Sequence, residues 1–438
     1  MLRTRLVSLI GRGVAGVSRW RGGHGSALPG LVVEKLHPHF LHEILSELPL
    51  GCAVVTGTNG KTTTTKMVTE LLQAAGLRVF TNPSGSNFTR GVVSAALPLL
   101  RGGRLPADVA VVELDEAYAV HFVREIAPRY CLLLNVLRDQ LDRFGEIDTT
   151  ARYLQSVAGA ATDAVVLNAD DPRVAAMASL ARPSARVSWF GLDPSLRGQF
   201  PTDEELHEED AAASVGPGEA LTRPLVGANG GDQVTLAALD GQRATYLVDG
   251  TRYDATLQLY GPHNALNAAS ALALTRAILG DRFDASSHVT RLNQVTAAFG
   301  RGEIWHLGER SLRLTLVKNP SGFRLALAGT DPSAPTLIAI NDHSADGRDI
   351  SWLWDVDFSA VAPCPSVATT GIRAADMALR LEYAGIPVAS VEPDLTAALS
   401  RFLQETRSGP LQIFSSYTAM LKLRASLKEL AAGSGVTA

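Results

Sequence analysis

The sequence is poor in cysteine, with only Cys52, Cys131 and Cys364 among its 438 residues. Their wide spacing excludes a CxxC pair, and an odd number of cysteines argues against a disulfide framework. Three scattered thiols also cannot supply the four cysteine ligands of a Cys₄ zinc site. Cys52 and Cys131 each begin a short aliphatic run that is typical of a strand, so we expect buried structural thiols at both positions.

The sequence also lacks a strong net charge and a long apolar run. The formal net charge is −4 and charged residues make up 19% of the chain. Such a chain has no global field to attract nucleic acid, and we predict no nucleic-acid partner. No apolar run approaches the roughly 18–20 residues that span a bilayer. We therefore predict a cytoplasmic protein.

The first 22 residues carry arginines at positions 3, 5, 12, 19 and 21 among Leu, Val and Ile. This stretch has no compact apolar segment and no convincing cleavage site, so it does not read as a signal peptide. It predicts a basic amphipathic helix that packs on the first domain. Peripheral contact with the inner face of the membrane is the alternative.

From about residue 50, short runs of β-forming residues alternate with helical stretches. This alternation is typical of βαβ units, in which helices cover both faces of a mainly parallel sheet. The predicted fold class is therefore α/β. The predicted strands are 53–56, 109–114, 131–134 and 164–168, and the predicted helices include 63–75 and 150–158.

The alternating pattern dissolves around residues 194–232, which include the acidic run 203–210 and several glycines. We expect a solvated insertion there, with a cation site as the alternative. A second alternating series begins past Arg301 and predicts a smaller, Rossmann-like α/β domain. Between the two series we predict hairpin strands 233–239, 244–248 and 252–259 and a helix 264–279. The later strands are 312–317, 336–340, 367–370, 388–391 and 411–414, with helices 374–383 and 418–430.

A glycine-rich segment joins the first predicted strand to the helix that follows it. It consists of Gly57, Thr58, Asn59, Gly60, Lys61, Thr62 and Thr63. Glycines let backbone N–H groups turn inward around phosphate oxygens, and the dipole of the following helix adds to the attraction. Lys61 would contact the β- and γ-phosphates, and the Thr62 hydroxyl would bind Mg²⁺. The segment is shorter than a usual Walker A motif, but its position between strand and helix predicts an ATP site.

Carboxylates follow the second predicted strand, at the edge where a metal-bound phosphate would lie. Glu113 is our candidate Mg²⁺ partner, either directly or through water. Asp115 and Glu116 fit a role in the site or an ordinary solvated loop equally well. Residues 135–145 follow the next strand, where ligands bind in open α/β sheets. A loop that only satisfies its own polar groups is the alternative there.

Further motifs extend over nearly the whole chain. They are GTNGKTTTT at 57–65, SGSN within 82–87, ELDE at 113–116, NVLRDQLDRFGE at 135–146, NADDP at 168–172, YGPHNALNAASA at 260–271, FGRGE at 299–303, KNPSGF at 318–323, NDHSADGRDISWLWDVDF at 341–358, GIRAADMALRLEYAGI at 371–386 and SSYTAML at 415–421. The chain resembles the Mur ligase superfamily and, more closely, its MurT family of lipid II isoglutaminyl synthase subunits. The phosphate loop marks only the superfamily, whereas KNPSGF and ADGRDISWLWDVDF are specific to MurT-like chains.

The resemblance implies three parts of the chain. Residues 1–45 would form the basic helical extension, 46–298 the central ATP-binding domain with its insertion at about 194–232, and 299–438 the C-terminal Mur ligase-like domain. Asn267 would contact the nucleotide, and Arg301 would bring a second positive charge from the C-terminal domain. His263 could contact the nucleotide or be a buried structural histidine.

Two positions depart from the family pattern. Family members often carry a four-cysteine zinc ribbon in the central domain, but residues 195–230 contain no cysteine. We therefore expect no structural zinc. Gly302 stands in FGRGE where the family usually has a bulkier apolar residue, and this change leaves Arg301 in place.

The resemblance implies ATP-dependent amidation of the D-glutamate α-carboxylate in the lipid II stem peptide. The reaction would give D-isoglutamine through an acyl phosphate, as a step of peptidoglycan biosynthesis. None of the three cysteines sits on the strand-to-helix turn of a triad glutaminase, so the chain would need free ammonia or a partner. The resemblance names that partner as a GatD-like glutamine amidotransferase.

The resemblance also implies a residue that completes the partner's catalytic triad. Asp349 would orient the partner's histidine across the interface. The alternative is that Asp349 only caps the segment that begins at Ile350. Asp346, Asp355 and Asp357 are the next candidates for the role.

Two other functions fit the phosphate loop. A self-sufficient Mur-type or folylpolyglutamate-type ligase would add an amino acid instead of ammonia. A regulatory nucleotide-binding module would bind nucleotide without turnover.

Overall fold

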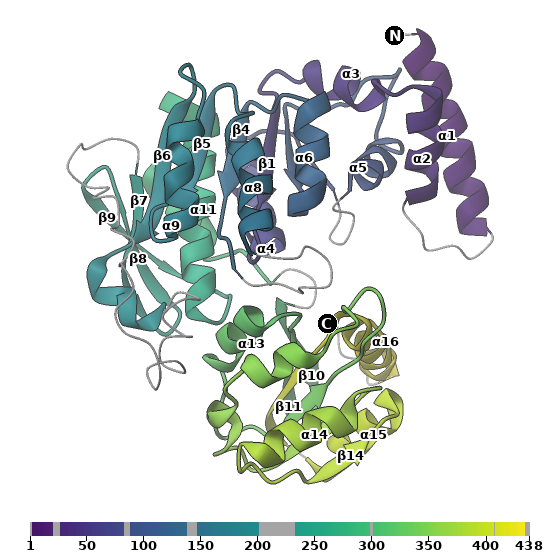
Figure 1. The fold of residues 1–438 in the computed structure, drawn as a ribbon, viewed down its shortest axis with the longest axis vertical. Helices are drawn as coiled ribbons and strands as arrows, with labels where there is room; N and C mark the ends of the chain where they lie inside the picture. The colour runs from purple at the N-terminus through teal and green to yellow at the C-terminus, as the bar shows by residue number, and fades with distance from the viewer. Residues whose placement is uncertain are drawn as a thin grey trace. The chain divides into compact units, whose positions relative to one another are not determined.

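The computed structural model describes residues 2–20, 27–82, 88–137, 147–200, 233–297, 301–406 and 408–433, without the side chains at 2, 17–20, 27, 301, 432 and 433. The chain divides into two compact units (Figure 1). Unit 1 holds Met1–Val136, Asp148–Gln258 and His263–Val295, and unit 2 holds Leu137–Ile147, Leu259–Pro262 and Thr296–Ala438. The N-terminal helices fall in unit 1, and the three-part division at 45/46 and 298/299 stays a prediction. No helix in these described ranges is long and apolar enough to cross a membrane.

Unit 1 is built on one large sheet with the strand order β2-β3-β1-β4-β5-β6-β7-β8-β9. In this spatial order, every neighbouring pair from β2 across β1 to β7 is parallel. Strands β7, β8 and β9 form antiparallel hairpins at one edge. The strands are β1 (Cys52–Thr56), β2 (Val79–Thr81), β3 (Val109–Glu113), β4 (Tyr130–Leu133), β5 (Ala164–Asn168), β6 (Arg186–Leu192), β7 (Gln233–Asp240), β8 (Arg243–Val248) and β9 (Thr251–Thr256).

The central strands of this sheet are buried along their whole length. Every residue of β1, β3, β4 and β5 is buried. Continuous aliphatic runs suit this position because helices cover both faces of a parallel sheet. The helices of unit 1 are α4 (Lys61–Ala74), α5 (Thr89–Ala96), α6 (Glu116–Glu125), α8 (Ile147–Ala158), α9 (Pro172–Ala175), α11 (Pro262–Leu279) and α12 (Ala285–Leu292).

The N-terminal residues form three further helices, α1 (Leu2–Trp20), α2 (Ala27–Leu36) and α3 (Phe40–Ser46). Helix α1 lies beside α2, which in turn packs on α5 (Figure 1). Gly30 of α2 allows this approach, because a Cβ there would lie 2.0 Å from the Arg90 carbonyl oxygen of α5. The predicted basic helix is therefore confirmed, and it packs on the first unit.

Unit 2 contains a six-stranded sheet with the order β10-β11-β15-β12-β13-β14. Strand β10 pairs antiparallel with β11, and all other pairs are parallel. The last strand of the chain, β15, therefore lies in the middle of the sheet. The elements are β10 (Arg301–Leu307), β11 (Arg310–Leu316), β12 (Thr336–Ala339), β13 (Val367–Thr370), β14 (Ser390–Glu392), β15 (Gly409–Ser415), α13 (Pro320–Leu327), α14 (Ala374–Tyr383), α15 (Leu395–Glu405), α16 (Tyr417–Gly433) and the 3₁₀ turns η4 (Ser351–Asp355) and η5 (Ser359–Val361).

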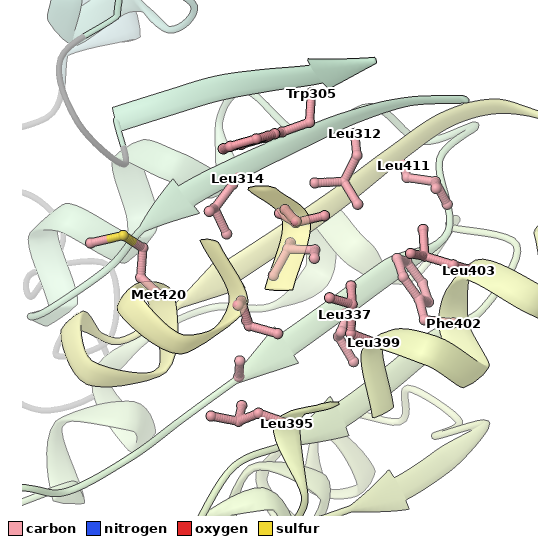
Figure 2. Packing of buried hydrophobic residues seen from close by; sticks show 14 of the residues in the cluster. Trp305, Leu312, Leu314, Leu337, Leu395, Leu399, Phe402, Leu403, Leu411 and Met420 are labelled. Carbon is pink, nitrogen blue, oxygen red and sulfur yellow. The ribbon is translucent and has the colours of Figure 1, made fainter. Parts of the chain in front are cut away.

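Two apolar clusters stabilise this second sheet. Figure 2 shows one of them, in which Trp305, Leu312 and Leu314 from the sheet pack with side chains of α15 and α16. The other is built around Phe323, Phe358 and Phe414. The mainly parallel α/β fold with a smaller C-terminal α/β part is confirmed. Strands β2, β6 and β10 were not predicted.

Candidate functional site

The glycine-rich segment lies at the point where the strand order of the first sheet reverses. Strand β1 has β3 on one side and β4 on the other. The chain goes from β1 to β2 and β3 on one side and then crosses to β4 on the other. Ligands of open α/β sheets bind at the carboxyl ends of the strands at such a point. The segment follows the carboxyl end of β1 directly and ends where α4 begins, at Lys61.

Two glycines shape this segment. Gly57 has φ +129°, and a Cβ there would lie 3.0 Å from both the Asn135 nitrogen and Leu134 Cβ. Gly60 has φ +88°, and a Cβ there would lie 2.5 Å from Asn267 Oδ1. Both positions therefore need glycine for conformation and for space. The segment runs into the first turn of α4, at Lys61, Thr62 and Thr63, and the dipole at the start of a helix favours an anion.

The Lys61 ammonium is held close to the segment that it follows. It donates to the carbonyl oxygens of Gly57 and Thr58 and lies 3.2 Å from Glu116 Oε1. The Lys61 residue is 7% exposed and Glu116 is 1% exposed. Glu116 begins α6, so the structure takes it out of the solvated loop and pairs it with the lysine. The burial of Glu116 is at odds with the solvated-loop interpretation, and a role of Glu116 in the site stays a prediction.

Thr62 and Glu113 also meet, as the predicted metal site requires. The Thr62 hydroxyl donates to Glu113 Oε1 over 2.8 Å. Asn82, just after β2, fixes the backbone of Glu113 with two hydrogen bonds of 2.9 Å, one in each direction. The end of β3 is therefore held by hydrogen bonds to the residue after β2, and the Glu113 carboxylate lies next to the first turn of α4.

The loop after β4 contacts the glycine-rich segment through hydrogen bonds. Asn135 Oδ1 accepts from the Asn59 N–H at 2.8 Å, and Asn135 Nδ2 donates to the Asn59 oxygen at 3.1 Å. Asp171, the N-cap of α9, accepts from the Val136 N–H at 2.7 Å. Burial raises the pKa of Asp171 despite these hydrogen bonds. Residues 138–146 of the same motif lie outside the described residues, as do residues 83–87 and the acidic run 203–210.

Asn267 of α11 completes the part of the site that belongs to unit 1. It is buried, borders Gly60, and its Nδ2 lies 3.4 Å from Asn264 Oδ1. The structure thus brings together the phosphate-loop residues, Glu113 and Asn267. Their roles as ligands stay predictions, as does a nucleotide contact for His263.

The remaining predicted site residues belong to unit 2. Arg301 begins β10, but its side chain lies outside the described residues. Asp349 is exposed, and its Oδ1 accepts from the Ser351 N–H at 2.8 Å. Hydrogen bonding from Ser351 lowers the pKa of Asp349. The capping contact is therefore present, and it leaves the carboxylate accessible at the surface.

The neighbouring candidate Asp346 has a different environment. It is buried and accepts from the Thr418 N–H at 2.7 Å, the Thr418 hydroxyl at 2.5 Å and the His343 N–H at 3.2 Å. These contacts join the 341–349 loop to the start of α16. Asp346 is a structural residue, which leaves Asp349, Asp355 and Asp357 as the exposed carboxylates of this region.

The three cysteines occupy structural positions. Cys52 and Cys131 are buried in neighbouring strands, and burial raises the pKa of both thiols. Cys364 is half-buried, and Gln412 Nε2 donates to its sulfur over 3.6 Å. A nucleophilic cysteine needs a lowered pKa and access to substrate, and the first two thiols have neither.

Sequence reasoning missed one residue of this site. Asn82 fixes Glu113 through backbone hydrogen bonds, yet the two residues are separated by 31 positions in the chain. No spacing rule relates them, because their contact depends on the pairing of β2 with β3. The available signal was its place at the start of the 82–87 motif, because strand β2 before it was not predicted.

Known proteins share both the sequence and the fold of this chain. Residues 55–275 match the Mur ligase middle domain, and residues 316–420 match the MurT ligase C-terminal family. The lipid II isoglutaminyl synthase (glutamine-hydrolyzing) subunit MurT of Streptococcus pneumoniae is 31% identical over 97% of this chain and 96% of its own.

Solved structures of Mur ligases share the fold. MurF of Acinetobacter baumannii superposes with a TM-score of 0.66 at 18% identity, covering 92% of this chain and 81% of that chain. MurF of Thermotoga maritima, solved in complex with ADP, gives a TM-score of 0.64 at 16% identity, covering 92% and 85%. The resemblance and the ligase class inferred from the motifs are therefore confirmed: the chain belongs to the MurT family of Mur ligases.

Proposed function

We propose that this protein is the ligase subunit of a lipid II isoglutaminyl synthase. It uses ATP to convert the α-carboxylate of D-glutamate in the lipid II stem peptide to the amide of D-isoglutamine. The observation that carries the proposal is the match to the MurT subunit over nearly the full length of both chains. The phosphate loop with Lys61, Thr62 and Glu113 around it supports the ligase chemistry.

The loop fits the phosphates of a nucleotide. Gly57 and Gly60 have positive φ, which supports a turn whose backbone N–H groups can point toward a phosphate. Lys61 would move from its carbonyl acceptors and Glu116 to the phosphate oxygens. A related MurF was solved with ADP, which agrees with this assignment.

The oxygen donors near the loop fit Mg²⁺. The Thr62 hydroxyl and the Glu113 carboxylate lie within hydrogen-bond distance of each other, and hard oxygen ligands of this kind suit Mg²⁺ when it is bound to a nucleotide. Bound Mg²⁺ would neutralise phosphate charge during transfer. Replacing Glu113 with Gln should raise the Mg²⁺ concentration for half-maximal activity by about 10- to 100-fold. An unchanged Mg²⁺ requirement would contradict this role for Glu113.

The reaction needs positioning and charge neutralisation rather than a protein nucleophile. The carboxylate oxygen of the substrate attacks the γ-phosphorus of ATP, and ADP leaves. Ammonia then adds to the carbonyl carbon of the acyl phosphate, loses a proton, and the C–O bond to phosphate breaks. Asn267 would orient the nucleotide, and Arg301 would add positive charge from unit 2.

Ammonia would come from a GatD-like glutamine amidotransferase partner. The buried, structural positions of Cys52 and Cys131 support this division of labour, because they cannot serve as glutaminase nucleophiles. Asp349 is an exposed carboxylate that could reach a partner's histidine. We propose it as the acidic member of the partner's triad.

Mass spectrometry of lipid II tests the proposal. Lipid II is incubated with the protein, ATP and ammonium, with and without the partner, and a loss of roughly 1 Da marks carboxylate-to-amide conversion. ADP release that depends on an amino acid, without ammonia, would instead show an amino-acid-adding ligase. Nucleotide binding without turnover under any of these conditions would show a regulatory module.

A further inference from the structure

Helix α1 has three large aliphatic side chains on the side that faces away from the rest of unit 1. Leu6 is 61% exposed, Leu9 is 62% exposed and Ile10 is 40% exposed. A Cβ added at Gly13 or Gly16 would meet nothing within 4 Å, so these glycines continue the same open side. The spacing of Leu6, Leu9, Gly13 and Gly16 places them on one face of the helix. We call these four residues and Ile10 the α1 outer face.

The inner face of α1 is formed by smaller side chains, two of them polar. Thr4, Val7 and Ser8 are buried, and Gly11 allows close packing, since a Cβ there would lie 2.6 Å from Val33 and 2.8 Å from Leu97. A helix on the surface of a globular protein normally shows the reverse arrangement, with its apolar face inward. The larger aliphatic side chains of α1 are therefore exposed to solvent and can bind another apolar surface.

Arginines flank the α1 outer face. The guanidinium groups of Arg3, Arg5 and Arg12 donate to the carbonyl oxygens of Leu36, Gly102 and Leu97. These acceptors are neutral, and no carboxylate lies within ion-pair distance of the three arginines in the part of the chain that the structure describes. Arg101 is exposed in the turn that Arg5 contacts. The positive charge beside the outer face is therefore not neutralised by an acidic neighbour.

The sequence around α1 has the same charge bias. The first 33 residues contain five arginines and no acidic residue, although the chain as a whole carries −4. The nearest acidic residues are already engaged, with Glu34 bonded to Arg90, Glu43 to Thr4 and His37, and Glu47 to Arg104. An apolar stripe bordered by unneutralised arginines is complementary to a surface that has acyl chains beneath anionic headgroups.

We propose that the α1 outer face binds an anionic lipid surface, with the helix in the plane of the headgroups. The role of this membrane binding in the reaction rests on the proposed function, because the substrate lipid II is itself held in a membrane by its lipid. Docking α1 there would raise the local concentration of substrate near unit 1. The binding itself depends only on the geometry and charge of α1.

Vesicle flotation with the full-length protein tests this binding. Vesicles of phosphatidylglycerol and phosphatidylethanolamine should retain the protein, and vesicles of phosphatidylcholine alone should retain much less. Raising the salt from about 0.05 M to about 0.5 M should weaken retention, because the headgroup charges are screened. Leu6→Gln combined with Leu9→Gln should lower vesicle affinity at least about tenfold. The fold should survive, because both side chains are already exposed.

Leu180→Gln combined with Leu430→Gln is the control, since both leucines are also exposed, at 44% and 45%, but lie elsewhere. The control should bind vesicles like the parent. The proposal fails if the parent does not bind, or if the outer-face variant binds as well as the control. Sedimentation velocity tests a further alternative. If the parent forms a dimer, the outer-face variant does not, and neither protein binds vesicles, the proposal also fails. The α1 outer face would then be a surface for self-association.

Amidation assays separate this inference from the proposed function. The outer-face variant should amidate detergent-dispersed lipid II at the parent rate and lipid II in anionic vesicles at a reduced rate. Amidation without vesicle binding would overturn only the membrane inference. Vesicle binding without any amidation would overturn only the proposed function.

Discussion

The Lys61 ammonium lies 3.2 Å from Glu116 Oε1, and both side chains are almost fully buried. In the proposed ATP site, the Lys61 ammonium would exchange the Glu116 carboxylate for a phosphate oxygen. Breaking a buried pair by removing one partner is destabilising, since the other charge stays buried. Substitutions of Lys61 and Glu116 can therefore separate the effect on activity from the effect on the stability of the fold.

Lys61→Ala is expected to lower ATP-dependent amidation at least about 100-fold, because the phosphates lose their cationic ligand. The fold should remain, with a lower melting temperature because Glu116 stays buried. Lys61→Ala combined with Glu116→Gln should recover part of the melting temperature and none of the activity. Amidation from free ammonia and melting curves measure the two effects. Near-normal amidation by Lys61→Ala would show that the loop is not the phosphate site.

Gly60→Ala should weaken nucleotide binding at least tenfold, which corresponds to about 1.4 kcal/mol. Its φ of +88° is costly for alanine, and the new Cβ would overlap Asn267 Oδ1. Gly250→Ala is the control, because Gly250 has φ +75° with nothing within 4 Å of a Cβ. Both variants should lose comparable stability from the backbone conformation. Calorimetric titration with ADP should show weaker binding for Gly60→Ala only, and parental affinity in that variant would refute the assignment.

Asp349→Asn should stop glutamine-driven amidation and leave ammonia-driven amidation near the parent rate. Asparagine caps a helical turn about as well as aspartate but cannot stabilise an imidazolium ion. Asp357→Asn is the matched control, because Asp357 Oδ1 accepts from the Ser359 N–H at 2.8 Å in the same way. Rates are compared with the partner present and with each nitrogen source. Equal glutamine-driven rates for Asp349→Asn and the parent would leave Asp349 as a cap only.

The Arg129–Asp163 pair should contribute stability in a pH-dependent way. Burial raises the pKa of Asp163, but hydrogen bonds from Arg129 and Thr162 outweigh it and lower the pKa overall. The contribution is therefore present above the unfolded pKa of about 4 and is lost as pH falls through the lower folded value. Asp163→Asn should cost roughly 0.5–1 kcal/mol at pH 7, since the pair is partly exposed.

Urea unfolding at pH 7 and near pH 3 measures this difference. The gap between parent and Asp163→Asn should shrink at the lower pH. Asp249→Asn, which breaks the pair with Arg276, should change stability little at either pH, because the Asp249 carboxylate is more exposed than that of Asp163. A gap of the same size at both values would mean that Asp163 acts through packing rather than through its charge.

The predictable parts of the molecule were those with strong local patterns. Continuous aliphatic runs predicted β1, β3, β4 and β5, because strands buried on both faces need them. Strand β2 has only three residues, and β10 begins beside Gly302, where φ is +80° and the sequence suggests a loop. Strand β6 mixes exposed and buried positions over its first residues. These strands depend on neighbours that are distant in the chain.

The same limit applies to the candidate site. The glycine-rich segment 57–63 is local, so its place between a strand and a helix could be predicted from spacing, and Lys61 and Thr62 could be proposed as ligands. The contacts of Glu116 with Lys61 and of Asn82 with Glu113 depend on sheet pairing and helix placement. The ELDE motif left Glu116 open between two interpretations, and only the packing of α6 argues against the solvated loop.

The central position of β15 has a consequence for when unit 2 can fold. Strand β15 pairs with β11 on one side and β12 on the other, so β10–β11 and β12–β13–β14 share no strand until β15 is in place. Domains fold as units during synthesis, starting from the N-terminal end. All strands of the first sheet have been synthesised by Thr256, whereas unit 2 must wait for Gly409–Ser415. A ribosome stalled before β15 would therefore hold a folded first unit and an incomplete second one.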